Sequence, residues 1–227
     1  MSNWWPYSPY WDIGIYIGGS NRACPQPNLT SSWVQTVNQQ GWDYYLTWVG
    51  PQSPCASGGP YNTYINNDVT TAYNQGKAEA NAAISAASNL GIYGLKAYYY
   101  DLEAYNMSNE TCRWAANSFV NGWSYSLQVL SGQKAGVYGS PCNAIDWPFI
   151  SNIPWVVWLA DWNLDPDVWG LACLADGYWV YNQRLHQYRG GHAETWGSYT
   201  LNVDNDCANG LVVPNGHLNA DPACTVE

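Results

Sequence analysis

Short apolar runs alternate with longer amphipathic segments along most of the chain. Seven runs have the length and composition of buried strands, at residues 12–17, 43–49, 97–101, 135–138, 155–160, 184–188 and 199–203. Helices are predicted at 30–41, 68–90 and 110–130, with capping residues before the first two and Gly41, Gly91 and Gly132 after them. This order predicts an α/β fold with a parallel sheet and helical crossovers.

In two of these predicted helices, the spacing of the side chains predicts which residues face the solvent and which face the core. In the segment 68–90, Gln75, Lys77 and Glu79 are expected on the solvent side. In the segment 110–130, the aromatic and apolar residues recur every three to five positions and are expected in the core. These residues are Trp114, Phe119, Trp123 and Leu127.

Three of the predicted strands carry an acidic residue at or just beyond their carboxyl ends: Asp101 with Glu103, Asp161, and Asp204. In a (β/α)8 barrel of the TIM type, these strand ends meet on one face, which holds the active site. A doubly wound sheet is the alternative fold. However, no glycine-rich phosphate loop follows any strand, so a nucleotide site has no support.

Asp101 and Glu103 follow the apolar run AYYY with a spacing of two residues. On a strand, this spacing directs both carboxyl groups to the same face. Repulsion between the like charges raises the pKa of one carboxyl group, as in glycosidases that use a general acid at neutral pH. The alternative is a strand end with two solvated acids, since a D-x-E pattern by itself is weakly specific.

Charge excludes some classes of partner. The 227 residues contain 7 Lys and Arg against 17 Asp and Glu, which gives a net charge of −10. Such a chain has no basic patch for nucleic acid or for an anionic membrane surface. The 15 Trp and 19 Tyr suit stacking against sugar rings, or they take the place of Phe in the core. No run reaches transmembrane length.

The seven cysteines indicate an exported protein with disulfides. They form no C-x-x-C pair, and three His residues in all make a zinc site improbable, so no metal or other cofactor is expected. Cys24 and Cys55 follow neighbouring strands and are predicted to bond. Although the N-terminus of this sequence lacks a basic start and an apolar segment, we expect a secreted, extracellular protein.

Several stretches, in order along the chain, resemble a known family. They are YIGGSNRACPQPNLTSSWV, GWDYYLTWVGPQSPC, YYYDLEAYN, GVYGSP, WLADW, and HQYRGGHAETWG with LNVDND. The chain is similar to a secreted, mostly actinobacterial, glycoside-hydrolase-like family, the domain of unknown function 1906 type. That family is related in fold to the lysozyme-type family 25 glycoside hydrolases. The resemblance extends from the N-terminus to about Asp206.

The resemblance implies a (β/α)8 barrel over residues 1–206, followed by a disulfide-tied tail, 207–227, packed on the barrel. Glu103 matches the lysozyme-type acid, and Asp101 matches its companion. Binding of substrate is assigned to residues of the cleft and to nearby aromatic rings: Asp161, Asp204, Trp162, Tyr188, Gln187 and Tyr105. Family members usually begin with an earlier strand carrying G-F-D-x-C, which is missing here, and the cysteine of that strand would explain the odd cysteine count.

The function implied by the resemblance is hydrolysis of an N-acetylated, peptidoglycan-like cell-wall glycan by a monomer. Glu103 would protonate the leaving oxygen. Asp101 would either stabilise the oxocarbenium-like centre in a retaining mechanism or orient an attacking N-acetyl group. Two alternatives remain: a catalytically degenerate barrel that binds glycan, and a purely structural barrel on the cell wall.

Overall fold

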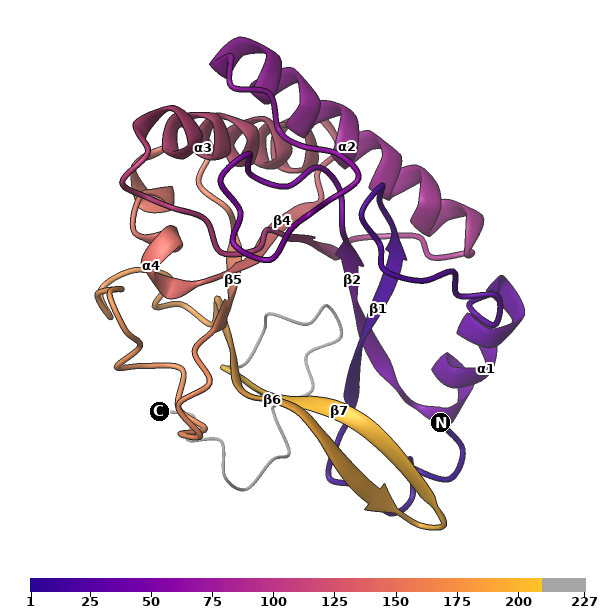
Figure 1. Ribbon diagram of the computed structural model, residues 1–227. Coiled ribbons are helices and arrows are strands. Elements are labelled where there is room, and N and C mark those ends of the chain that lie inside the picture. The colour runs from indigo at the N-terminus through magenta and orange to yellow at the C-terminus, as the bar shows by residue number, and fades with distance from the viewer. Residues whose placement is uncertain (210–227) are drawn as a thin grey trace.

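A computed structural model describes residues 1–209 of the 227. One seven-stranded sheet runs through it in the order β1 to β7 (Figure 1). The strands are β1 (Asp12–Gly18), β2 (Asp43–Trp48), β3 (Ala97–Asp101), β4 (Lys134–Gly139), β5 (Val156–Ala160), β6 (Arg184–Trp196) and β7 (Tyr199–Ala208). The pairs from β1 to β6 are parallel, whereas β7 pairs antiparallel with β6.

The helices begin where the sequence provides a capping side chain. They are α1 (Ser31–Gln40), α2 (Val69–Asn89), α3 (Glu110–Tyr125), which continues into a π-helical turn (Ser126–Leu130), α4 (Pro141–Ala144) and a 3-10 turn (Trp147–Phe149). Thr30, Asp68 and Asn109 accept hydrogen bonds from backbone N–H groups in the first turns of α1, α2 and α3. None of the described helices combines the length and the apolar character needed to cross a membrane.

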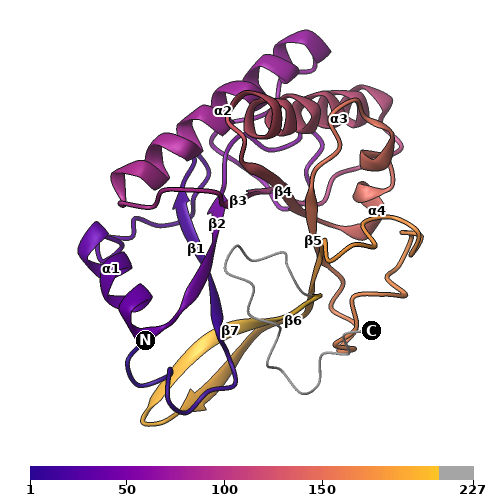
Figure 2. The same ribbon diagram turned by 180° about the vertical axis from the view of Figure 1, so that it is seen from behind.

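The sheet curls into a half-barrel with helices on its outer side. In both views α2 and α3 lie side by side over β3 and β4 (Figures 1 and 2). Strand alternation in β3 directs Tyr98 and Tyr100 outward into the main hydrophobic core, which includes residues of α2 and α3. Ala97 and Tyr99 lie in a second, inner cluster, and Asp101 continues this inner row.

Aromatic rings fill the concave side of the sheet. Tyr45, Tyr99 and Trp158 contact one another edge to face, with ring centroids 5.0–5.9 Å apart. Gly136 on β4 makes room for this group, because a Cβ there would lie 2.6 Å from the Tyr99 ring. The interior is therefore a packed core below the strand ends, not an open channel.

The edges of the sheet, β1 and β7, are bridged at one end by the N-terminal segment. Trp4 Nε1 donates to Tyr199 O at 3.0 Å, and Asp43 N donates to Trp11 O at 3.0 Å. Trp4 and Trp42 are buried together, with partly buried side chains of the β6–β7 hairpin packed against them. The first residues of the chain therefore connect the α1 side of the fold to its last hairpin.

Two sequence expectations about the sheet need correction. The sheet is not wholly parallel, because Gly197 adopts a left-handed turn (φ 63°) and pairs Trp196 directly with Tyr199, leaving no length for a crossover helix. Residues 1–209 form a curled, half-barrel sheet of seven strands, which is compatible with a barrel-like fold but is not a full (β/α)8 barrel. The tail expected on the barrel lies outside the described residues from 210 onward.

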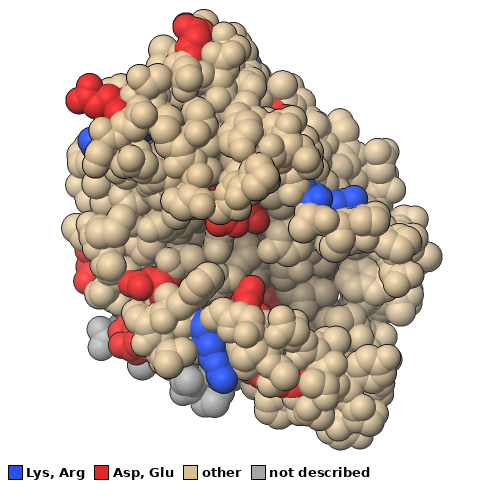
Figure 3. All heavy atoms as spheres, in the orientation of Figure 1, with Lys and Arg blue, Asp and Glu red and all other residues tan. Residues whose placement is uncertain are grey.

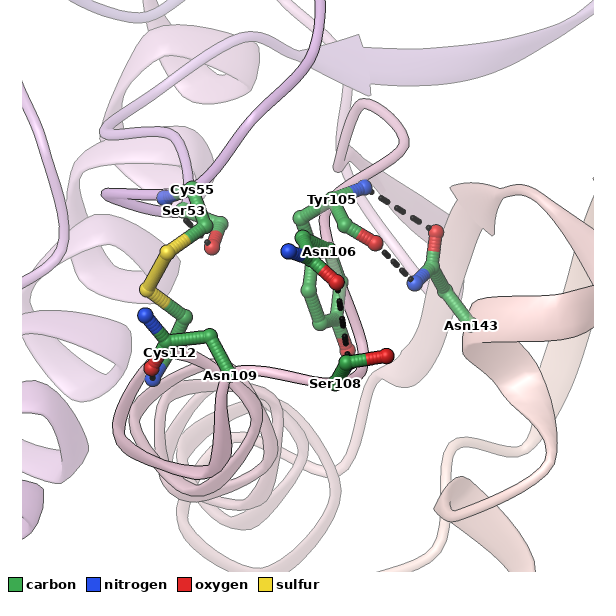
Figure 4. Close-up of a disulfide and its surroundings, with 8 residues drawn as sticks. All are labelled: Ser53, Cys55, Tyr105, Asn106, Ser108, Asn109, Cys112 and Asn143. Atoms are coloured by element: carbon green, nitrogen blue, oxygen red, sulfur yellow. Dashed lines mark hydrogen bonds between the residues drawn. A yellow bond between two sulfur atoms is a disulfide. The ribbon is translucent and has the colours of Figure 1, made fainter.

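The predicted disulfide between Cys24 and Cys55 is wrong. Cys55 is bonded to Cys112 (Figure 4), Cys142 is bonded to Cys173, and Cys24 is free and exposed. The loop after β2 runs toward β3, where Ser57 N donates to Ala104 O and Asn106 N donates to Cys55 O. These bonds carry Cys55 to the start of α3.

Two expectations about helix faces are also wrong. Trp114 is 55% exposed, while Phe119, Trp123 and Leu127 are fully buried as predicted. Glu79 does not lie on the solvent side of α2, since its carboxylate accepts a hydrogen bond from Trp48 Nε1 at 2.6 Å. Burial raises the pKa of Glu79, and the bond from Trp48 opposes this shift.

Candidate active site

The two acids of the D-x-E sequence form a hydrogen-bonded pair at the carboxyl end of β3. Asp101 is 7% exposed and Glu103 is partly exposed. Burial, and then the charge of Glu103, raise the pKa of Asp101 to about 8, and burial also raises the pKa of Glu103. The hydrogen bond from Asp101 opposes the shift at Glu103. At neutral pH the pair therefore holds a proton that the partly exposed member can reach.

A buried glutamine fixes the backbone around this pair. Gln52 Nε2 donates to Asp101 O at 2.7 Å, and Glu103 N donates to Gln52 Oε1 at 2.8 Å. Gln52 lies in the loop after β2 and is fully buried. The side-chain amide of Gln52 thus bonds to the backbone on both sides of the single residue that separates the two acids. The sequence analysis missed Gln52, because nothing in the QSP sequence marks it as buried.

Two tyrosines stand between the acid pair and the acids of β7. Tyr138 is paired in register with Asp101 on the neighbouring strand. Burial raises the pKa of Tyr16 on β1, and the charges of Asp101, Asp204, Asp206 and Glu103 raise it further. Burial and the same kind of acidic surroundings raise the pKa of Tyr138. Tyr16 therefore lies within electrostatic reach of four carboxyl groups from two different strands.

Gln187 connects two other residues that the sequence assigned to substrate binding, Trp162 and Asp204. Its Oε1 accepts from Trp162 Nε1 at 2.9 Å and from Tyr138 Oη at 3.0 Å. Its Nε2 donates to Asp204 Oδ2 at 3.1 Å. The amide orientation is fixed because both donors require an oxygen at that position. Trp162, Gln187 and Asp204 are thus brought together, and Trp162 remains 65% exposed.

Asp206 is an interior acid that the sequence analysis did not assign to the site. It accepts from Trp158 Nε1 at 2.6 Å and from Tyr45 Oη at 3.3 Å. Burial raises its pKa to about 7, and the charge of Asp204 adds to this while the two donors oppose it. Asp206 follows Asp204 by two residues, as Glu103 follows Asp101. This repeated spacing is the sequence feature that could have identified Asp206 as a site residue.

The other assigned residues lie away from this group. Asp161 accepts from Ala172 N at 3.0 Å and so holds the loop after β5. Tyr105 is buried in the main core, and Asn143 bonds to its backbone N–H and C=O (Figure 4). Tyr188 packs against a small cluster around Val168. The structure therefore gives these three side chains local packing partners.

A cavity of about 320 Å³ opens beside the acids, between the edge strands β1 and β7. It is lined by Tyr16, Gln187, Asp204 and Asp206, among others, and not by Asp101 or Glu103. Acidic atoms lie on two sides of a hollow near the centre of one face of the molecule, with mostly uncharged side chains around it (Figure 3).

Within residues 1–209, no three His, Cys, Asp or Glu side chains lie close enough together to bind a metal ion. Both ring nitrogens of His186 bond to backbone carbonyls, those of Asp167 and Asp161. His192 Nε2 bonds to Glu194 at 2.8 Å. Both histidines are thus engaged in hydrogen bonds within the fold.

Comparison with known families places this curled α/β sheet among glycoside-hydrolase-like domains. The model of one such family, described as Rv2525c-like, glycoside hydrolase-like domain, matches residues 2–208, and the chain belongs to this family. No curated protein sequence matches the chain at a significant level.

Two solved structures share this fold. An uncharacterized B. stearothermophilus protein has 16% sequence identity and a TM-score of 0.54, with 91% of this chain and 88% of that chain covered. The catalytic domain of endolysin ply40, from bacteriophage P40 of Listeria monocytogenes, has 14% identity and a TM-score of 0.52, with 91% and 86% covered. At these identities the likeness concerns the fold.

Proposed function

We propose that this protein is a glycoside hydrolase that cleaves an N-acetylated glycan of the cell-wall type. The proposal is carried by the buried Asp101–Glu103 pair, in which burial and then the charge of Glu103 raise the pKa of Asp101 to about 8, so that the pair retains a proton at neutral pH. General acid catalysis of glycoside cleavage needs such a proton. The family and the endolysin-like fold support the choice of substrate class.

Glu103 is the proton donor in this proposal, because it is the more exposed member of the pair. The proton held by Asp101 passes along the shared hydrogen bond to Glu103, which gives it to the glycosidic oxygen as the bond to the anomeric carbon breaks. Water then adds to the anomeric carbon and returns a proton to the pair. Asp101 supplies the hydrogen bond that keeps the proton shared, and its negative charge after proton transfer stabilises the oxocarbenium-like centre or orients an N-acetyl group for attack. Gln52 bonds to the backbone of both acids and so keeps their carboxyl groups in fixed positions relative to each other.

Substrate contacts are assigned to the Gln187 network. Trp162 offers an exposed ring face for stacking, and Asp204 accepts hydrogen bonds from sugar hydroxyl groups. Asp161 holds the loop that carries Trp162, whereas Tyr188 and Tyr105 support the fold through packing and do not contact the sugar in this proposal. The protein acts as a monomer on a polysaccharide or cell-wall glycan, needs no cofactor, and acts outside the cell, where disulfides persist.

A glycan-binding module is the second candidate function. Its support is that Trp162 is held by Gln187 independently of the acid pair, so stacking does not require catalysis. In that case the acids act as hydrogen-bond acceptors for the sugar.

Release of reducing ends from peptidoglycan and from N-acetylglucosamine oligomers separates the two functions. The parent protein is expected to release reducing ends, and Glu103→Gln is expected to bind the glycan without releasing them. Glu110→Gln, an exposed glutamate at the start of α3, is the matched control. Binding without release by the parent would favour the module, and release by Glu103→Gln would refute the role of Glu103.

A further inference from the structure

A second groove, of about 690 Å³, lies at the end of the sheet opposite Asp101. Gln133, Trp155 and Gln183 line it and directly precede β4, β5 and β6, so they mark the amino-terminal ends of three strands. The acid pair is found at the carboxyl end of β3. The two sites therefore lie on opposite ends of parallel strands and share no residue.

The groove lining combines aromatic rings with side-chain amides and has no charged residue. It comprises Gln128, Gln133, Pro148, Ile153, Pro154, Trp155, Gly177, Tyr178, Trp179, Val180, Tyr181 and Gln183. Such a lining does not attract a phosphate or a carboxylate. Planar aromatic faces with amide donors and acceptors suit a neutral ring that has apolar C–H faces and polar edges.

Each of the three amides uses one of its atoms to hold the backbone. Gln183 Nε2 donates to Trp155 O at 2.5 Å, and Gln128 Nε2 donates to Ile153 O at 3.0 Å. Gln133 Oε1 accepts from Lys96 N at 2.8 Å. The amide orientations are therefore fixed, and one atom of each amide remains available for a ligand.

The loop that bounds the groove is held in a strained conformation. Trp179 and Asn182 have left-handed backbones (φ 52° and 56°) on either side of Tyr181, which is 82% exposed. Backbone strain at non-glycine residues persists only where surrounding contacts enforce it, and it is common at binding sites.

Buried contacts anchor this loop. Trp179 is buried, and its Nε1 donates to Pro154 O at 2.8 Å. The Arg184 guanidinium is fully buried and donates to Tyr178 O and Ala175 O. On the other side, Lys134 Nζ lies 3.2 Å from the centroid of the Trp155 ring. Tyr181 is consequently presented to solvent on a rigid base, which reduces the entropy lost on binding.

We propose that this groove is a second glycan-binding site, in which sugar rings stack on Tyr181 and Trp155 while the glutamine amides bond hydroxyl or acetamido groups. Because the residues that line the groove are uncharged, the proposed ligand is a neutral oligosaccharide. The choice of an N-acetylated sugar rests on the proposed function, but the groove does not depend on the acid pair. A polymer held there stays close to the hydrolytic site, which raises its effective concentration.

Calorimetric titration with the N-acetylglucosamine hexamer tests the proposal. The test variant is Tyr181→Ala, and the control is Tyr199→Ala, which removes a 58% exposed tyrosine at the tip of the β6–β7 hairpin. We expect Tyr181→Ala to weaken binding at one site by about tenfold. We expect Tyr199→Ala and Glu103→Gln to bind at that site as the parent does.

The possible outcomes separate this inference from the proposed function. Binding that is sensitive to Tyr181→Ala, in a protein that hydrolyses no glycan, supports the groove and contradicts the hydrolase. Hydrolysis together with equal binding by Tyr181→Ala and Tyr199→Ala overturns the groove and leaves the hydrolase standing. The glycan-binding proposal is also refuted if the parent does not bind the hexamer at millimolar concentration. Binding of a proline-rich peptide, but not of the hexamer, would refute it as well.

Discussion

Glu103 donates its backbone N–H to the side chain of Gln52, a residue that precedes it by 51 positions. The same amide donates to Asp101 O, so a single side chain from the loop after β2 sets the path of the chain between the two acids. The position of the acid pair is therefore determined by the loop after β2 as well as by β3.

Replacing this glutamine tests its role. Gln52→Ala removes both bonds and leaves a buried N–H and a buried C=O without their partner. We expect the free energy of unfolding to fall by about 2–4 kcal/mol. Urea denaturation measures the change, and Gln39→Ala, an exposed position on α1, is the control. Equal stability of the two variants would show that Gln52 does not hold the turn.

The raised pKa of Asp101 predicts a pH dependence of stability. Between about pH 4 and about pH 8 the unfolded chain ionises this group while the folded protein keeps it protonated. The unfolded state then binds fewer protons, so the contribution of Asp101 to stability falls as pH rises through this range. Asp101→Asn has no such cost and should gain stability over the parent progressively from pH 4 to pH 8.

Thermal unfolding of both proteins at several pH values measures this difference. Asp165→Asn, at an exposed position in the loop after β5, is the matched control and should follow the parent. A difference between Asp101→Asn and the parent that grows toward low pH would contradict the predicted sign.

The packing of α2 on α3 depends on two glycines, one on each helix, that lie against the backbone of the other helix. A Cβ at Gly122 would lie 2.0 Å from Tyr73 O, and one at Gly76 would lie 2.1 Å from Phe119 O. Gly122→Ala must therefore push the helices apart, and we expect a loss of about 2 kcal/mol or more in the free energy of unfolding. Gly177→Ala, where nothing lies within 4 Å of the added Cβ, should leave stability nearly unchanged.

The cysteine arrangement predicts a specific labelling pattern. Alkylation of the native, unreduced protein should modify Cys24, and peptide mapping should find Cys55 linked to Cys112 and Cys142 linked to Cys173. Replacing Cys55 and Cys112 together by Ser should cost about 2–5 kcal/mol, because the bond closes a long loop. Cys24→Ser is the control and should cost little. A Cys24–Cys55 peptide would contradict the structure.

Local patterns were sufficient for most of the elements. The apolar run before Asp101, the capping residues Thr30 and Asp68, and the left-handed Gly41 each act within a few residues, so the sequence alone predicted β3, α1 and α2. The D-x-E spacing indicated the acid pair, but β3 ends at Asp101, and Gln52 from the loop after β2 holds the backbone that leads to Glu103.

Features that depend on distant contacts were not predictable. Cys55 pairs with Cys112 because the loop after β2 turns toward β3, a direction that no local signal encodes. The order of the elements predicts a parallel sheet throughout, whereas the two-residue turn at Gly197 makes β7 antiparallel to β6. Gln52 and Asp206 belong to the candidate site through the partners that they meet in three dimensions.

The bridge between the first and last parts of the fold has a consequence for synthesis. Trp4 bonds to Tyr199, and Asn205 donates to Tyr10, in each case across 195 positions. The N-terminal aromatic segment leaves the ribosome long before its partners do, so it remains unpaired through most of translation. Contacts of such high contact order form late. Closure of the seam between β1 and β7 is therefore expected only after the β6–β7 hairpin has been synthesised, and a truncation before the hairpin would leave Trp4 and Trp42 exposed and prone to aggregate.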